Sequence, residues 1–166
     1  VQYLRDQLGL IGNAAETEEL ARSIEDSGEV VIVPALAGLG APHWKPDARG
    51  VISGLSFASG RAQIARAALE AMAHQTHDLA SAFAADGALW SRLRIDGGMS
   101  ANDWMAQDLA DILDLEVERP EFIETTALGA AILAAVGCGM HGSLQTAAQA
   151  MRSDAKTFVP AMDGKG

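Results

Sequence analysis

The residues best suited to holding a ligand lie in one short stretch, LRIDGGMSANDW, at positions 93–104. Gly97 and Gly98 carry no Cβ and can adopt positive φ angles, so another molecule can approach the backbone closely there. Ser100, Asn102 and Asp103 are residue types that cap a helix N-terminus. In an open α/β sheet, ligands bind against such turns, beyond the carboxyl ends of strands. The stretch predicts a ligand-binding turn between a strand and a helix. A plain turn is the alternative, because a motif as short as Asp-Gly-Gly also occurs by chance.

Few other side chains are placed for chemistry. Asp96 follows a predicted buried strand, where it could hold a water on a metal ion or anchor the glycine turn through backbone amides, and we favour the anchoring role. His74 and His77 could share one helix face, but no cysteine or carboxylate trio accompanies them, so we expect no metal site. We find no nucleophile paired with a base, no P-loop and no G-x-G-x-x-G pattern. The sequence therefore predicts no catalytic residue in this chain.

The elements that must position the turn alternate between helices and strands, so the predicted fold class is α/β. Hydrophobic periodicity predicts helices over 1–10, 17–27, 63–83, 103–113, 127–136 and 144–151, and strands over 29–34, 51–57, 93–96 and 115–118. Thr17 is the predicted N-cap of its helix, and the strands 29–34 and 51–57 are expected to be antiparallel. The β-branched run EVVIVP predicts a strand buried on both faces, and the apolar segment 127–136 predicts a helix buried between layers.

Composition limits the class of protein. The chain has 166 residues, 49% of them apolar, which is enough for one domain with a real core. The net charge of −10 argues against nucleic acid or an anionic membrane as a partner. The single cysteine, Cys138, allows no disulfide within the chain, so we expect a cytoplasmic protein. The sequence starts at Val1 inside a helical pattern and stops in a polar tail, so we expect a piece of a longer protein.

Four segments, in this order, resemble the C-terminal part of the FGGY family of carbohydrate kinases, and within it the glycerol-phosphorylating branch. They are PALAGLGAPHW (34–44) with PDARG (46–50); Gly54-Leu55 through Ile64, Arg66, Leu69, Glu70 and Ala73; DGG (96–98) with Asn102; and ERP (118–120) with TTALGAA (125–131). Other sugar kinases of the family usually carry Gly-Glu-Arg where this chain has Gly38-Leu39-Gly40. The similarity covers nearly the whole chain.

The resemblance implies a fold of two actin-like, ribonuclease-H-like domains with a cleft between them. Residues 1–163 would form the C-terminal nucleotide-binding domain, a mixed sheet flanked by helices and incomplete at its N-terminal side, and 164–166 a tail. The parent enzyme would use ATP and Mg²⁺ to phosphorylate glycerol, giving ADP and glycerol 3-phosphate. Glycerol would bind through the N-terminal domain, which also holds the catalytic aspartate, so we expect the chain alone to be inactive. The parent is expected to be a homo-oligomer.

The resemblance also implies which residues meet the nucleotide. Gly98 and Asn102 match positions that contact it, and Gly97 forms the same turn. Gln2 matches a glutamine that lines the adenine side, and Ala14 falls near another wall of that pocket. Two alternatives stay open: a kinase for another polyol or sugar of the same family, and a non-enzymatic actin-like module that binds a nucleotide.

Overall fold

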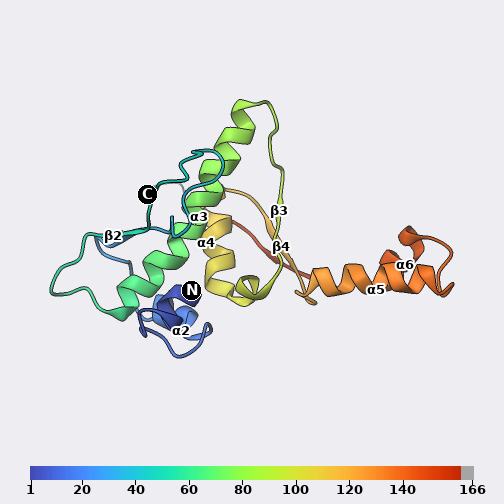
Figure 1. The fold of residues 1–166 in the computed structure, drawn as a ribbon, viewed down its shortest axis with the longest axis horizontal. Coiled ribbons are helices and arrows are strands. Elements are labelled where there is room, and N and C mark those ends of the chain that lie inside the picture. The colour runs from blue at the N-terminus through green and yellow to red at the C-terminus, as the bar shows by residue number, and fades with distance from the viewer. Residues whose placement is uncertain (162–166) are drawn as a thin grey trace.

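Two packed helices, α3 and α4, form the centre of the molecule, and a helical arm extends away from them (Figure 1). The computed structural model describes residues 1–161; the predicted tail, 164–166, lies outside the described residues. The helices are α1 (Gln2–Asp6), α2 (Glu16–Arg22), α3 (Arg61–Ala85), α4 (Asp103–Leu113), α5 (Thr125–Gly137) and α6 (Leu144–Ala150), with a 3₁₀ turn η1 (Gly98–Ala101). The strands are β1 (Val31–Val33), β2 (Val51–Ser53), β3 (Leu93–Arg94), β4 (Val117–Pro120) and β5 (Ala155–Phe158).

The strands form two small sheets. β1 and β2 pair antiparallel, as predicted, with Val31 opposite Ser53. The other sheet has the order β3-β4-β5, in which β3 and β4 are parallel and β4 and β5 antiparallel. The sequence did not predict β5, and it placed the end of β4 before Arg119, whereas the strand continues to Pro120. This mixed sheet leads directly into the glycine turn, because β3 ends just before it.

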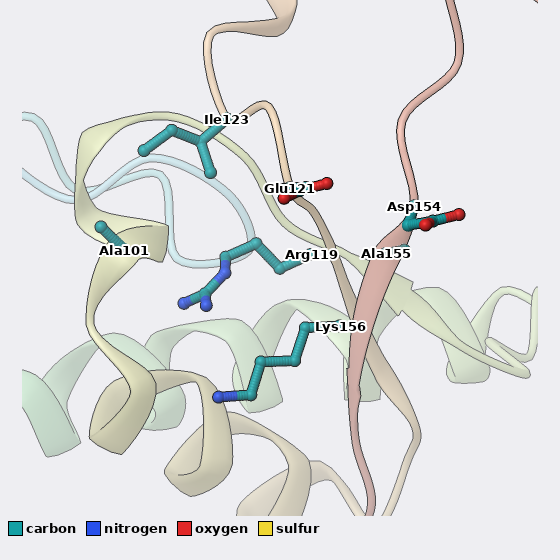
Figure 2. A pocket seen from close by; sticks show the side chains of 7 residues that line it. All are labelled: Ala101, Arg119, Glu121, Ile123, Asp154, Ala155 and Lys156. Atoms are coloured by element: carbon teal, nitrogen blue, oxygen red, sulfur yellow. The ribbon is translucent and has the colours of Figure 1, made fainter.

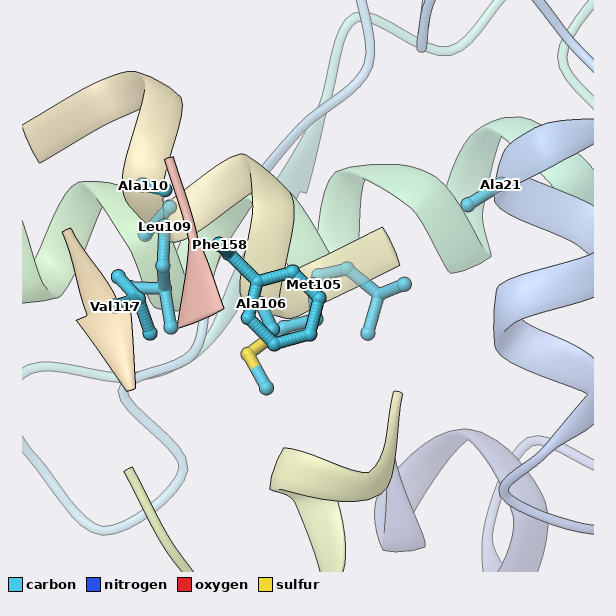
Figure 3. Close-up of a cluster of buried hydrophobic side chains, with 9 residues drawn as sticks. Ala21, Met105, Ala106, Leu109, Ala110, Val117 and Phe158 are labelled. Carbon is cyan, nitrogen blue, oxygen red and sulfur yellow. The ribbon is translucent and has the colours of Figure 1, made fainter. Parts of the chain in front are cut away.

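The core lies where α2, α3 and α4 meet the mixed sheet (Figure 3). Its buried residues are Ala21, Leu69, Ala73, Met105, Ala106, Leu109, Ala110, Val117 and Phe158. Four of them are alanines on helices, and their small side chains let the helix backbones approach closely. The core thus fixes α4, and with it the turn in front of α4, against both α3 and the sheet.

Some predicted surroundings are wrong. Thr17 is not an N-cap, because α2 begins at Glu16 and Thr17 is buried inside it. β1 is not covered on both faces, since Val31 and Val33 are exposed. The predicted buried helix is α5, but only Ala135 is buried in it, and α5 lies in the projecting arm (Figure 1). Among residues 1–161, no helix combines the length and hydropathy that crossing a bilayer requires.

One carboxylate oxygen in the packed region is buried without a hydrogen-bond partner among the described residues. This atom is Oδ2 of Asp108, in α4. The pKa of Asp108 is raised to about 7, mainly because the side chain is buried and also because the carboxylates of Glu70 and Asp111 lie nearby, while Arg66 acts in the opposite direction. Between the unfolded value of 3.8 and about 7, the folded chain binds a proton that the unfolded chain lacks. Folding stability therefore falls as the pH rises through this window.

We predict that Asp108→Asn stabilises the chain more at pH 8 than at pH 5. The amide carries no charge, so the variant escapes the cost of ionising a buried acid. Its gain in unfolding free energy should be larger at pH 8 by about 2 kcal/mol. Urea unfolding at the two pH values measures the gain, with Asp47→Asn in the exposed loop as the control. Equal gains at both values would contradict the prediction.

The helical arm carries exposed apolar side chains. Leu133 of α5 is 62% exposed and Met140, just beyond α5, is 72% exposed. Exposed apolar patches promote association. We expect the 166-residue chain to self-associate, and Leu133→Glu to reduce this without lowering the melting temperature. Gln145→Glu on α6 adds the same charge but removes no apolar side chain. In sedimentation velocity, equal association of both variants and the wild type would contradict the prediction.

Candidate functional site

The glycine turn uses its two glycines for different reasons. Gly97 has φ = +79°, a conformation that other residues adopt only with strain. Gly98 begins the turn η1 without a positive φ, so the predicted backbone freedom is confirmed only at Gly97. A Cβ added at Gly98 would meet no described atom within 4 Å. Position 97 therefore requires glycine because of its backbone conformation. At position 98, the absence of a side chain leaves the space in front of the backbone open.

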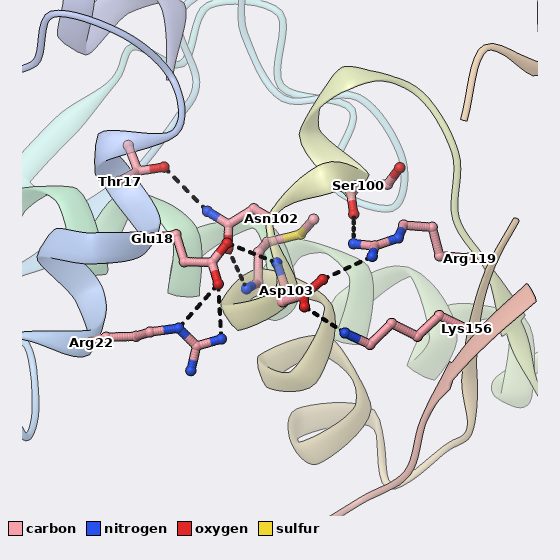
Figure 4. Close-up of polar contacts among 9 residues, drawn as sticks. Thr17, Glu18, Arg22, Ser100, Asn102, Asp103, Arg119 and Lys156 are labelled. Atoms are coloured by element: carbon pink, nitrogen blue, oxygen red, sulfur yellow. Dashed lines mark hydrogen bonds and ion pairs between the residues drawn. The ribbon is translucent and has the colours of Figure 1, made fainter. Parts of the chain in front are cut away.

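Asn102 caps α4, as its residue type predicted. Its Oδ1 atom accepts a hydrogen bond from the Met105 amide at 2.9 Å, and its Nδ2 atom donates to Thr17 Oγ1 at 3.2 Å. The next amide, that of Asp103, donates to Glu18 Oε2 at 3.1 Å. Two of the unpaired amides at the start of α4 are thus satisfied, one of them by a side chain of α2 (Figure 4).

The side chain of Asp103 ties the same helix end to the mixed sheet (Figure 4). Arg119 of β4 pairs with it at 2.8 Å and also donates to the carbonyl of Ser100, inside the turn. Lys156 of β5 pairs with its other oxygen. The ammonium of Lys156, and then the guanidinium of Arg119, hold the pKa of Asp103 below its usual value. The turn is therefore fixed on one side by α2 and on the other by β4 and β5.

A cavity of about 1040 Å³ opens in front of the turn. It is lined by Val1, Gln2, Tyr3, Arg5, Asp6, Gln7, Ala14, Ala15, Thr17, Glu18, Leu36, Leu69, Gly98, Met99, Ala101 and Asn102. Four of the five residues that the sequence named, Gln2, Ala14, Gly98 and Asn102, belong to this lining. Gly97 is not part of the lining, although its positive φ shapes the turn whose other residues line the cavity. Residues from five separate places in the chain thus meet around one cavity.

Sequence reasoning missed several residues of this lining. Tyr3 and Met99 stand next to predicted site residues and are part-exposed to the cavity, and Leu36 comes from the long loop after β1. A single tyrosine beside Gln2 was a usable signal, since an aromatic face suits a planar ligand. The sequence predicts Thr17 only as an N-cap. In the structure, Thr17 and Glu18 contact residues 85 positions away, which no local pattern reveals.

A second cavity, of about 550 Å³, is shown in Figure 2, and Ala101 lines both cavities. The side chains of Arg119 and Lys156 extend into this second cavity, while Glu121 and Asp154 stand at its edge. Both cations already pair with Asp103. Their charge is therefore used to hold the turn in place.

Asp96 connects the turn to the arm. Its Oδ2 atom accepts a hydrogen bond from the Thr125 hydroxyl, at the first residue of α5. This structural contact differs from the predicted one, which involved the backbone amides of the turn. Within residues 1–161, no three histidine, cysteine or acidic side chains gather closely enough to hold a metal ion.

Comparison with known proteins gives consistent matches. The sequence model for the C-terminal domain of the FGGY family of carbohydrate kinases matches residues 1–138. The glycerol kinase of Rhodospirillum centenum is 56% identical over 162 residues, which is 98% of this chain and 32% of that protein. The glycerol kinase of Gluconobacter oxydans is 52% identical, over 98% of this chain and 32% of its own length. The chain thus spans about a third of the length of these relatives.

A solved structure agrees in fold. The crystal structure of Plasmodium falciparum glycerol kinase with ADP superposes with a TM-score of 0.79 at 34% identity, covering 98% of this chain and 32% of that one. The predicted class, an α/β domain of actin-like ATPase type with a mixed sheet flanked by helices, is confirmed. Because the family model covers most of its length, the chain belongs to the FGGY family of carbohydrate kinases and corresponds to their C-terminal domain.

Proposed function

We propose that this chain is the nucleotide-binding C-terminal portion of a glycerol kinase. The parent enzyme transfers the γ-phosphoryl group of ATP to glycerol and releases ADP and glycerol 3-phosphate. The observation that carries the proposal is the cavity in front of the glycine turn. It gathers Gln2, Ala14, Gly98 and Asn102, the residues that the family resemblance assigns to the nucleotide. The names of the relatives support the reaction and the acceptor.

The chemistry of the lining suits an adenine nucleotide. Tyr3, Met99 and Leu36 present apolar surface on which a planar base can pack. The bare backbone of Gly98 lets a ribose or phosphate approach more closely than any side chain would permit. Asn102 uses one hydrogen of its Nδ2 atom on Thr17, and the second is left to donate to the ligand.

The remaining chemistry belongs to the rest of the parent protein. Mg²⁺ accompanies ATP, because phosphate oxygens are its usual ligands in phosphoryl-transfer enzymes. Glycerol and the catalytic groups meet the γ-phosphate from a facing N-terminal domain, and residues 1–163 form one wall of that cleft. The parent enzyme works in the cytoplasm as a homo-oligomer.

A kinase for another polyol or sugar of the family is the main rival. The segment Gly38-Leu39-Gly40 favours glycerol, because other sugar kinases of the family usually have Gly-Glu-Arg there. Steady-state kinetics of the intact protein with glycerol and with a panel of sugars decides between them. A kcat/KM for any sugar above that for glycerol would contradict the proposed acceptor.

Gly98→Val gives the sharpest test of the nucleotide site. The valine side chain would enter space that no described atom occupies, so the fold should tolerate it, but the side chain would project toward the nucleotide. We expect the affinity of the intact protein for ATP to fall at least about tenfold, which corresponds to ~1.4 kcal/mol. Isothermal titration with ATP measures this, together with the melting temperature in the absence of nucleotide.

Two control variants separate binding from folding. Gly129→Val on α5 also enters open space, but it lies outside the cavity and should leave ATP affinity unchanged. Gly97→Ala should lower the melting temperature, because a positive φ costs a non-glycine residue about 1–3 kcal/mol. If Gly98→Val binds ATP as the wild type does, the nucleotide does not approach this turn.

The isolated chain should not phosphorylate glycerol. Phosphoryl transfer depends on positioning and charge stabilisation by groups on both sides of a cleft, and this chain spans only about a third of its relatives. A coupled assay for ADP release, with glycerol and ATP and the purified 166-residue chain, measures the activity. Turnover by protein free of contaminating kinase would contradict the expectation.

A further inference from the structure

Thr17 is a buried polar residue at the edge of the cavity, and neither its position in α2 nor the resemblance gives it a role. Its side chain is 1% exposed, yet the residue lines the same hollow as Asn102 and Ala14. We propose that Thr17 is a positioning residue of the nucleotide site, whose hydroxyl fixes the orientation of the Asn102 amide. This inference rests on the proposed function, because it concerns the affinity of that same site for a nucleotide.

The hydroxyl of Thr17 has a single hydrogen to donate. Thr17 Oγ1 lies 2.7 Å from the carbonyl oxygen of Ala14, which can only accept, so the hydroxyl donates there. With that hydrogen used, Oγ1 can only accept from its other neighbour. That neighbour is Nδ2 of Asn102, at 3.2 Å.

The orientation of Asn102 follows from this. An amide turned by 180° would bring Oδ1 against a hydroxyl that has no hydrogen to offer, and Nδ2 against the amide N–H of Met105. Both contacts would fail, so the Nδ2 end of Asn102 is held against Thr17, a residue of the cavity lining. The hydroxyl of Thr17 and the amide of Met105 thereby act together to keep the Nδ2 donor of Asn102 beside the cavity. The Thr17 hydroxyl also joins two walls of the cavity, since Ala14 belongs to one wall and Asn102 to the other.

A separate contact lets this role be tested without losing the fold. Glu18 Oε2 accepts from the Asp103 amide, so α2 and the start of α4 remain joined when the hydroxyl is removed. The core residue Ala21 also holds α2 in place. Thr17→Val keeps the shape of the side chain and removes only its hydrogen bonding.

The experiment measures ADP affinity of the intact protein by isothermal titration, and its melting temperature without nucleotide. Thr17→Val should weaken ADP binding about three- to tenfold, and Thr17→Ser should restore it to within about twofold. The KM for glycerol should not change. Thr76→Val is the matched control, since it removes a hydroxyl that donates to a helix carbonyl outside the cavity. It should lower stability and leave ADP affinity unchanged.

Asn102→Asp removes the Nδ2 donor itself, and it replaces Thr17→Val in the test if that variant folds poorly. The carboxylate keeps the cap on Met105 but cannot donate, so ADP affinity should fall at least as much as in Thr17→Val. The double variant Thr17→Val/Asn102→Asp should lose no more ADP affinity than Asn102→Asp alone, because Thr17 acts through Asn102. Additive losses, or wild-type affinity in Thr17→Val, would overturn this inference and leave the proposed function intact. Failure of the wild-type protein to bind ADP would overturn both.

Discussion

The start of α4 is the point on which the site depends. The first amides of a helix have no hydrogen-bond acceptor within the helix. Here the side chains of Asn102 and Glu18 supply acceptors for two of these amides. Each of these side chains also contacts a second group: Asn102 reaches Thr17, and Glu18 pairs with Arg22. Satisfying the helix end therefore joins α2 to α4 and closes one side of the cavity around the glycine turn.

Charge completes the arrangement from the opposite side. Asp103 directly follows the cap, and the cations of Arg119 and Lys156 neutralise it from two neighbouring strands. Because Arg119 also holds the Ser100 carbonyl, the turn between Gly97 and Asn102 is fixed at its middle as well as its ends. A rigid turn with an open face suits a ligand that must approach the backbone. Arg119 and Lys156 thus stabilise the turn by pairing with Asp103.

Local signals were enough to predict the turn and its helix, but not their supports. The bounds of α4 and the cap at Asn102 came from residue types within a few positions of each other. Thr17, Glu18 and Lys156 act on residues 53 to 85 positions away, and no periodicity carries that information. Apolar patterns predicted that β1 and α5 would be buried, which is wrong for both, because a pattern records composition and not neighbours. β5 was missed because a strand of four residues with Lys156 and Thr157 inside it shows no apolar run.

We propose that the adenine nucleotide binds in the cavity between α1, α2 and the glycine turn. A crystal structure of the intact protein with ADP tests this proposal most directly. We expect density for the nucleotide in this cavity, with Gly98 in contact and Asn102 Nδ2 donating to the nucleotide while still bound to Thr17. Nucleotide density at another place on the protein, with this cavity empty, would contradict this assignment.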